Sequence, residues 1–187
     1  MPKLQPNWVL VRVKVVQPSV TECEIIQGAL SHVRAPGQAE AGPSQPGHEY
    51  CGVVLEVGEG VTALRAGDRV TSPAIIPCKA CARCNASDEV GCLRPLHVGF
   101  NVPGAFADSI ALPEWGLVKV PDGPTDHEVA TLQPLGACVA YVQAAELRTG
   151  DRVAVLGQGP IGLGCLQLAK MSGAGLLVAV DVRPENL

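Results

Sequence analysis

VAVLGQGPIGLG, residues 153–164, is the most informative stretch of this 187-residue chain. It begins as a continuous apolar strand, passes through three glycines spaced G-x-G-x-x-G, and continues into a helical segment. A second apolar run, LLVAVDV at 176–182, follows this helix. The order strand, glycine turn, helix, strand predicts one βαβ unit, and hence a parallel sheet covered on both faces.

The three glycines predict a dinucleotide-binding turn. Gly157 allows the tight turn, Gly159 lets the backbone approach a pyrophosphate, and Gly162 lets the helix pack closely on the strand. Pro160 and Ile161 complete the turn at the start of the helix, where free N–H groups favour phosphate. The alternative is an ordinary βα turn that happens to be rich in glycine.

Asp181 supports the dinucleotide interpretation, because it ends the second strand 24 residues after Gly157. An acidic side chain at this place accepts hydrogen bonds from an adenosine ribose, and its charge disfavours a 2′-phosphate. The sequence therefore favours NAD over NADP. Arg183, two residues further on, is a cation that weakens this preference.

Four cysteines occur upstream in PCKACARCNASDEVGC, residues 77–92, with the spacing CxxCxxCx7C. A CxxC pair brings two thiolates within reach of one tetrahedral ion, and two further cysteines close the shell. Four protein ligands leave no open coordination position, so we predict a structural zinc. An iron–sulfur cluster and a disulfide are the alternatives. The ligands would be Cys78, Cys81, Cys84 and Cys92.

The chain up to about residue 120 has the pattern of short strands. Residues 9–16 alternate apolar and polar side chains, and Val-rich or alternating segments recur within 50–71, 104–113 and 116–121. The Gly/Pro-rich segment 35–47 is expected to be an exposed loop. This pattern predicts an all-β barrel or sandwich.

The pattern changes after residue 122. Thr125 and Glu128 form a T-x-x-E capping box, and an Ala-rich helical segment follows. We therefore divide the chain into a β domain, 1–122, with a zinc lobe at 77–92, and a segment, 123–187, that contains a connecting helix and the start of a nucleotide-binding domain.

Composition excludes several functions. The net charge is -4, and no basic run of the kind that binds nucleic acid occurs. The apolar runs are broken by glycine or charge well short of the ~20 residues that a membrane span needs. The first residues lack the pattern of a signal peptide, so a reducing, cytoplasmic setting is expected, in which cysteines serve metal or catalysis before disulfides.

These features together resemble the zinc-containing branch of the medium-chain dehydrogenase/reductase family, the alcohol, polyol and threonine dehydrogenases. The pattern G-H-E-x-x-G-x-x-x-x-x-G-x-x-V is present as GHEYCGVVLEVGEGV at 47–61, followed by GDRV at 67–70. The four-cysteine lobe, the segment LQPLGACVAY at 132–141 and the glycine turn then follow in family order.

The resemblance implies a GroES-like β-barrel catalytic domain followed by an incomplete Rossmann domain, a doubly wound parallel sheet. It implies hydride transfer between a small-molecule alcohol or polyol and NAD, in a homo-oligomer, with a catalytic zinc beside the structural one. Such a zinc lowers the pKa of the alcohol oxygen. The alternative is a non-catalytic, zinc-stapled GroES-like module or an inactive truncated relative.

The resemblance also assigns the catalytic residues, with two departures. His48 and Glu49 stand in the G-H-E motif, and the resemblance implies that His48 binds the catalytic zinc and that Glu49 tunes or transiently binds it. Thr21 takes the position of the hydroxyl that relays the substrate proton. Ser19 stands where the family has a cysteine ligand, and Gln133 stands where polyol dehydrogenases have a glutamate ligand. Both replacements are poor zinc ligands. Glu22 occupies the position of the acid that follows the threonine.

Two cysteines are candidate substitutes for these missing zinc ligands. Cys23 would lie one helical turn beyond Ser19, and Cys138 follows Gln133 by five residues. The alternative is that both, like Cys51 and Cys165, are small buried hydrophobic residues. The remaining histidines are expected on the surface or in loops (His32, His97) and in the first turn of a helix (His127).

Family members are about twice as long as this chain. A sheet that ends after two strands leaves an open edge and an uncovered apolar face. We therefore predict that the 187-residue chain alone is catalytically inactive and prone to associate.

Overall fold

The computed structural model describes residues 4–27 and 45–187. The chain divides into two compact units, Met1–Gln133 and Pro134–Leu187. His32 and most of the expected loop at 35–47 lie outside the described residues.

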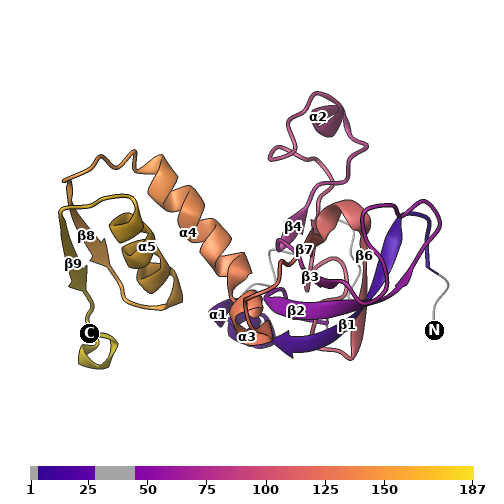
Figure 1. Cartoon of the computed structure of the whole chain (residues 1–187), viewed down its shortest axis with the longest axis horizontal. Coiled ribbons are helices and arrows are strands. Elements are labelled where there is room, and N and C mark those ends of the chain that lie inside the picture. The colour runs from indigo at the N-terminus through magenta and orange to yellow at the C-terminus, as the bar shows by residue number, and fades with distance from the viewer. Residues whose placement is uncertain (1–3, 28–44) are drawn as a thin grey trace. The chain divides into compact units, whose positions relative to one another are not determined.

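A five-stranded antiparallel sheet forms the body of the first unit (Figure 1). The alternating segment at 9–16 is an inner strand, which pairs with strands on both sides. The predicted strands are therefore confirmed. In sheet order they are β6 (Ser109–Pro113), β1 (Trp8–Val16), β2 (Tyr50–Val57), β3 (Arg69–Thr71) and β7 (Val118–Lys119).

The core of this unit is aliphatic. Val9 and Val11 point from β1 to the same face of the sheet and are fully buried. They belong to a cluster with Tyr50, Val54 and Leu112, among other residues of the sheet and its loops. The valine-rich alternation thus supplies one apolar face, and burial of this face holds the strands together.

Smaller elements complete the first unit. The short strands β4 (Ile75–Ile76) and β5 (Leu96–His97) pair at the base of the cysteine loop, which carries α2 (Ala82–Asn85) and extends away from the sheet in Figure 1. The helix α1 (Val20–Ile26) follows β1, and the 3-10 turn η2 (Glu114–Gly116) follows β6.

The helix α3 (Asp126–Ala130) begins with the predicted capping box. Thr125 accepts a hydrogen bond from the N–H of Glu128, whose carboxylate accepts one from the N–H of Thr125. Because α3 packs against β1 and β2, the structure places residues 123–133 with the first unit, whereas the sequence suggested a boundary after residue 122.

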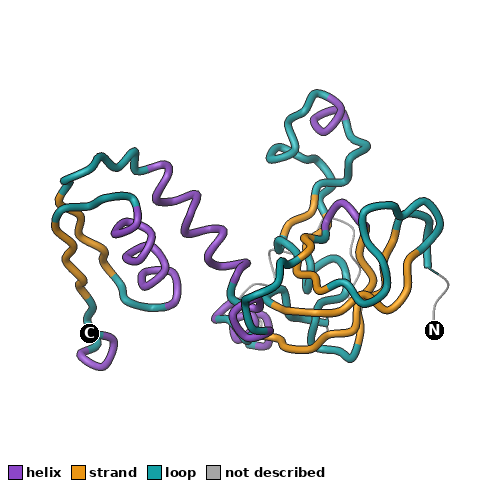
Figure 2. The backbone as a smooth tube through the Cα atoms, in the orientation of Figure 1, coloured by secondary structure: helices purple, strands orange, loops and turns teal. Residues whose placement is uncertain are grey.

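The second unit is the predicted βαβ arrangement. The strands β8 (Arg152–Leu156) and β9 (Leu176–Val180) pair in parallel, with α5 (Pro160–Met171) connecting them and packing against both, as Figure 2 shows. The helix α4 (Leu132–Ala144) precedes β8, and the 3-10 turn η3 (Pro184–Asn186) follows β9. None of the helices in the described residues is long and apolar enough to cross a bilayer.

Candidate functional site

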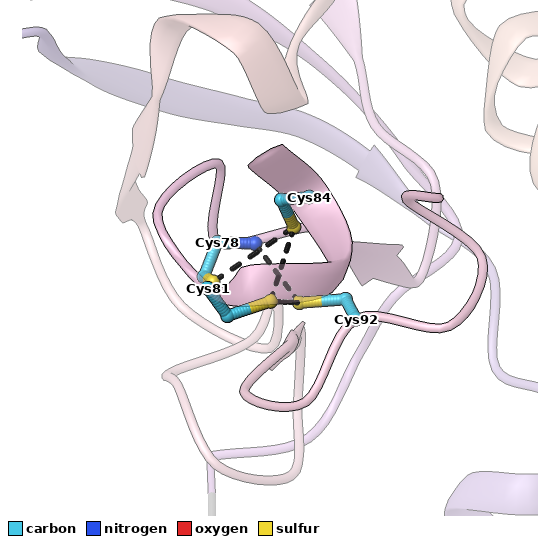
Figure 3. A group of neighbouring side chains, drawn as sticks. All are labelled: Cys78, Cys81, Cys84 and Cys92. Carbon is cyan, nitrogen blue, oxygen red and sulfur yellow. Dashed lines mark hydrogen bonds between the residues drawn. The ribbon is translucent and has the colours of Figure 1, made fainter. Parts of the chain in front are cut away.

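The four cysteines of the lobe converge on one point (Figure 3). Their sulfur atoms all lie within 4.8 Å of one another, and the shortest Sγ–Sγ distances are 3.5 Å for Cys81–Cys84 and 3.9 Å for Cys81–Cys92. With Zn–S bonds of about 2.3 Å, the sulfurs of a tetrahedral site lie about 3.8 Å apart. The four thiols are free and too far apart for a disulfide, so the arrangement fits a metal ion such as structural zinc.

The backbone of the lobe prepares these sulfurs for a cation. The N–H groups of Cys84 and Leu93 lower the pKa of the Cys81 thiol to about 6. Burial, together with the neighbouring sulfurs of Cys81 and Cys92, raises the pKa of Cys84 to about 12. One thiol thus ionises readily while another resists adding a second negative charge, and a divalent cation removes this conflict.

The glycine turn has the geometry of a phosphate-binding loop. Gly157 has a φ of 90°, a conformation that favours glycine. A Cβ on Gly162 would lie 1.7 Å from the carbonyl oxygen of Gly157, so the approach of α5 to the turn requires glycine there. A Cβ on Gly159 would meet no atom within 4 Å. The fold itself therefore gives no steric reason for Gly159, and the open space in front of it fits an approaching ligand.

Asp181 lies at the end of β9, beside this turn. Its Oδ2 accepts hydrogen bonds from the N–H of Gln158 (2.6 Å) and the amide of Asn186 (3.1 Å), and its Oδ1 accepts one from the N–H of Arg183 (2.8 Å). These donors, the Gln158 N–H first, lower the pKa of the Asp181 carboxyl. A carboxylate offers about four acceptor positions, so one remains open on Oδ1.

Gln158 is a residue of this turn that the sequence analysis did not single out. It is buried, and its side-chain amide donates to the carbonyl oxygen of Val155 at 2.7 Å. Its backbone N–H is the donor to Asp181. Gln158 thus links the ends of β8 and β9, while Pro160 and Ile161 form the first turn of α5, which no side chain caps.

A second polar cluster lies in the first unit around His48. Glu22, on α1, places its Oε1 2.6 Å from His48 Nδ1, and both side chains are buried. Burial would raise the pKa of Glu22, but hydrogen bonds from His48 and Ser19 outweigh it and lower this pKa to about 2. Glu22 is therefore an ionised partner that fixes the His48 ring and leaves Nε2 as the nitrogen that faces away from it.

Glu49 lies on the other side of the ring. Its Oε1 is 3.9 Å from His48 Nε2, and its Oε2 accepts a 2.6 Å hydrogen bond from the Gln17 amide. Burial raises the pKa of Glu49, although His48 and Gln17 oppose this effect. The structure thus brings the two predicted residues together and adds Glu22 and Gln17 to them.

Ser19 has a role in the fold of α1. It is the N-cap, and its hydroxyl accepts from the N–H of Thr21 and donates to Glu22 Oε2 at 2.5 Å. Cys23, the proposed substitute ligand, is exposed. It is therefore not the buried hydrophobic residue that the alternative interpretation expected. The residue one turn beyond Ser19 that reaches His48 is Glu22. Thr21 is half-buried at the start of the same helix.

Cys138, the other candidate, packs inside the second unit. Its thiol lies 3.4 Å from the carbonyl oxygen of Ile161 and against Gly164 of α5. This position agrees with the buried hydrophobic interpretation. Gln133 is half-buried near the start of α4.

Phe100 stands next to the histidine, with 6.3 Å between the two ring centroids. Its segment is fastened to the chain that precedes His48, because the N–H of Ala105 donates to the carbonyl oxygen of Gly47 and that of Phe106 to Pro46. The aromatic ring gives the polar cluster one apolar wall. His97, which was expected on the surface or in a loop, is half-buried in β5, with its ring 6.4 Å from that of Phe100 and nearly perpendicular to it.

Comparisons with known proteins agree with this architecture. The alcohol dehydrogenase GroES-like domain matches residues 5–122. The chain is 36% identical over 190 residues to L-threonine 3-dehydrogenase of Sinorhizobium fredii NGR234, and 34% identical to that of Rhizobium rhizogenes K84. Both alignments cover the whole chain but only 53% of the relative, so the chain spans about half the length of these curated relatives.

Solved structures show the same extent of similarity. Alcohol dehydrogenase from Thermus sp. ATN1 has a TM-score of 0.85 and 31% identity, covering 100% of this chain and 54% of that one. A second similar structure is a protein of Sinorhizobium meliloti 1021, classed as a zinc-binding dehydrogenase and solved bound to NADP. It has a TM-score of 0.86 and 28% identity, and the match covers 99% of this chain and 52% of that one. The expected fold, a GroES-like β domain followed by part of a Rossmann domain, is confirmed. The chain belongs to the alcohol dehydrogenase GroES-like domain family.

Proposed function

We propose that this chain is the N-terminal part of an NAD-dependent dehydrogenase that oxidises a hydroxyl group of a small alcohol, polyol or amino alcohol. The threonine dehydrogenases among its relatives make L-threonine the first alcohol to test. In this proposal the second unit binds the adenosine half of the cofactor, the first unit supplies His48, Glu49 and Thr21 to the substrate, and the cysteine lobe holds a structural zinc. NAD, when bound, supplies the hydride acceptor.

The open space at Gly159 beside the Asp181 carboxylate is the observation that carries the proposal. Three features meet there: a glycine at a position where the fold has room for a side chain, an uncapped helix N-terminus, and a carboxylate with an open acceptor position. The helix N-terminus favours a pyrophosphate, and the carboxylate favours a ribose hydroxyl. This combination supports an adenine dinucleotide more specifically than it supports a simple anion.

Binding of cofactor fragments to the purified 187-residue chain tests the proposal. We expect calorimetry to show that ADP-ribose binds at least tenfold more tightly than its 2′-phosphorylated analogue, because the negative charge of Asp181 repels the added phosphate. Asp181→Asn keeps an acceptor oxygen but removes this charge, so it should reduce the difference in affinity between ADP-ribose and its 2′-phosphorylated analogue.

Arg183→Ala is the matched variant. If the 2′-phosphorylated analogue binds more tightly to the unmodified chain and loses this advantage in Arg183→Ala, then Arg183 selects the cofactor and the preference for NAD is wrong. The absence of binding by both fragments would overturn the proposal for the second unit as a whole.

A further inference from the structure

The groups that surround His48 are already engaged with one another. Ser19, which stands at a cysteine-ligand position of the family, uses its hydroxyl to cap α1 and to donate to Glu22. Glu22 is occupied by His48 Nδ1, and one oxygen of Glu49 is occupied by Gln17. The donors left for a metal ion are therefore His48 Nε2 and the second oxygen of Glu49.

No third ligand completes this pair in the part of the chain that the structure describes. Among residues 4–27 and 45–187, the four lobe cysteines are the one group of three or more Cys, His, Asp or Glu side chains placed to hold an ion. Cys23 directly follows Glu22, so its side chain leaves α1 about 100° around the helix from the one that reaches His48, and it is exposed. Catalytic zinc sites use three protein ligands, and a donor set of one imidazole and one carboxylate does not fit this requirement.

We propose that the His48 site works without a metal, and that His48 is its proton-transfer group, positioned by Glu22. The proposal rests on the proposed function. Glu22 Oε1 accepts from the Nδ1–H of His48, so Nδ1 keeps its proton and the Nε2 lone pair is left to accept the proton of a substrate hydroxyl. Phe100 supplies an apolar wall on one side of the ring, and His48 itself is buried.

The proton and electron balance of this step is simple. NAD, when bound, would supply the acceptor for the hydride that leaves the carbinol carbon with its electron pair, while the hydroxyl proton would move to His48 Nε2. The carbon–oxygen double bond forms, and the positive charge on the imidazole is balanced by the Glu22 carboxylate, 2.6 Å away. Glu22 is thus a positioning residue, because it acts through His48.

Counting zinc ions per chain by native mass spectrometry tests the proposal, using protein expressed with added zinc and then desalted. We expect one zinc in the unmodified chain and in His48→Gln, and none in the double variant Cys81→Ser/Cys84→Ser. Ser19→Cys puts a thiolate at the position where the family has its cysteine ligand, so it should raise the count to two, whereas Ser19→Ala should leave it at one. Two zinc ions in the unmodified chain, one of them lost in His48→Gln, would overturn the proposal.

NMR of the imidazole nitrogens gives a second readout, in which the response to zinc is measured on the unmodified chain. We expect His48, assigned by comparison with His48→Gln, to carry its proton on Nδ1, and its Nε2 signal to stay unchanged when zinc is added. Glu22→Gln should shift the tautomer toward Nε2–H. A zinc-induced shift at Nε2 would contradict a metal-free site. Binding of ADP-ribose reports separately on the proposed cofactor site, so failure of one proposal is distinguishable from failure of the other.

Discussion

The roles of Ser19 and Glu22 beside His48 follow from the hydrogen bonds that each side chain makes. The family has a cysteine ligand where this chain has Ser19. A thiolate there binds a metal, whereas the serine hydroxyl accepts a hydrogen bond from a backbone N–H of the first turn and so caps the helix. The carboxylate of Glu22 then has two partners, Ser19 and His48, and stays ionised although it is buried.

Glu22 therefore makes stability depend on pH. Its pKa falls from an ordinary value of 4.5 to about 2 on folding, so its contribution is fully present above about pH 4.5 and is lost as the pH falls toward 2. We expect Glu22→Gln to lower the free energy of unfolding by about 1–3 kcal/mol at pH 7 and to flatten its decline between pH 4.5 and 2. Urea unfolding across this pH range measures both effects.

Glu24→Gln is the control, because it makes the same chemical change on the same helix without the partner at His48. In this variant the free energy of unfolding should fall between pH 4.5 and 2 as steeply as in the unmodified chain. Equal slopes in all three proteins would show that the pair between Glu22 and His48 does not contribute to stability.

Elements place the cofactor-binding groups. The parallel pairing of β8 and β9 brings the glycine turn and Asp181 to the same edge of the sheet, since both follow the carboxyl ends of their strands. The helix α5 approaches this edge so closely that Gly162 has no room for a side chain, whereas Gly159 has room and no neighbour.

The two glycines should therefore respond differently to alanine. In Gly162→Ala the added Cβ collides with a backbone oxygen, and we expect a loss of about 1–3 kcal/mol or more in stability of the second unit. Gly159→Ala should change stability by no more than about 0.5 kcal/mol but weaken ADP-ribose binding at least tenfold. Thermal unfolding and calorimetry, run on both variants, separate the two effects. Unchanged binding in a folded Gly159→Ala would argue against a phosphate at this turn.

A hydrogen bond from η2 anchors the start of the cysteine lobe. The indole N–H of Trp115, in η2, donates to the carbonyl oxygen of Pro77 at 2.9 Å, directly before the first cysteine. In a Trp8→Phe background, where Trp115 is the sole tryptophan, its fluorescence should report on the lobe.

Removal of zinc by a chelator should loosen the lobe and leave the sheet folded. The buried cluster of the first unit contains none of the four cysteines, so its packing does not require the ion. We expect a red shift of Trp115 emission and faster proteolysis within 78–92, with an unchanged far-ultraviolet circular dichroism signal of the sheet. A cooperative loss of both signals would mean that the metal also holds the core together.

On the scale of the whole molecule, the second unit exposes much of its apolar surface. Leu176, Val178 and Val180 alternate along β9 and are each more than 40% exposed, and Leu156 at the end of β8 is 79% exposed. Such a contiguous apolar face is uncommon on isolated chains. The observation agrees with the expectation that the 187-residue chain associates with itself.

Sedimentation velocity of Val178→Lys tests this expectation. A charge in the middle of the exposed face of β9 should shift the chain toward monomer, because burying the lysine in an interface costs more than leaving it in water. Val90→Lys, at a fully exposed apolar residue of the lobe, is the matched control and should leave the distribution unchanged. If the lobe variant alone dissociates the chain, the interface lies on the lobe.

The sequence by itself determined those features whose partners lie close along the chain. The glycine turn, the capping box at Thr125 and the four-cysteine loop depend on spacings of a few residues, and local backbone geometry converts each spacing into one arrangement. The alternation of β1 likewise predicted a buried face without knowledge of its neighbours.

Only the tertiary structure decided which groups surround His48. Gln17 directly follows β1, Glu22 lies on α1 and Phe100 comes from beyond the lobe. Their meeting depends on the pairing of β1 with β2 and on the hydrogen bonds that fasten residues 105 and 106 to residues 46 and 47. No spacing in the sequence encodes these contacts, because each joins segments separated by many residues. The choice of Glu22 over Cys23 shows the reason most directly: neighbours on a helix differ by 100° in direction, and packing selects the one that is buried.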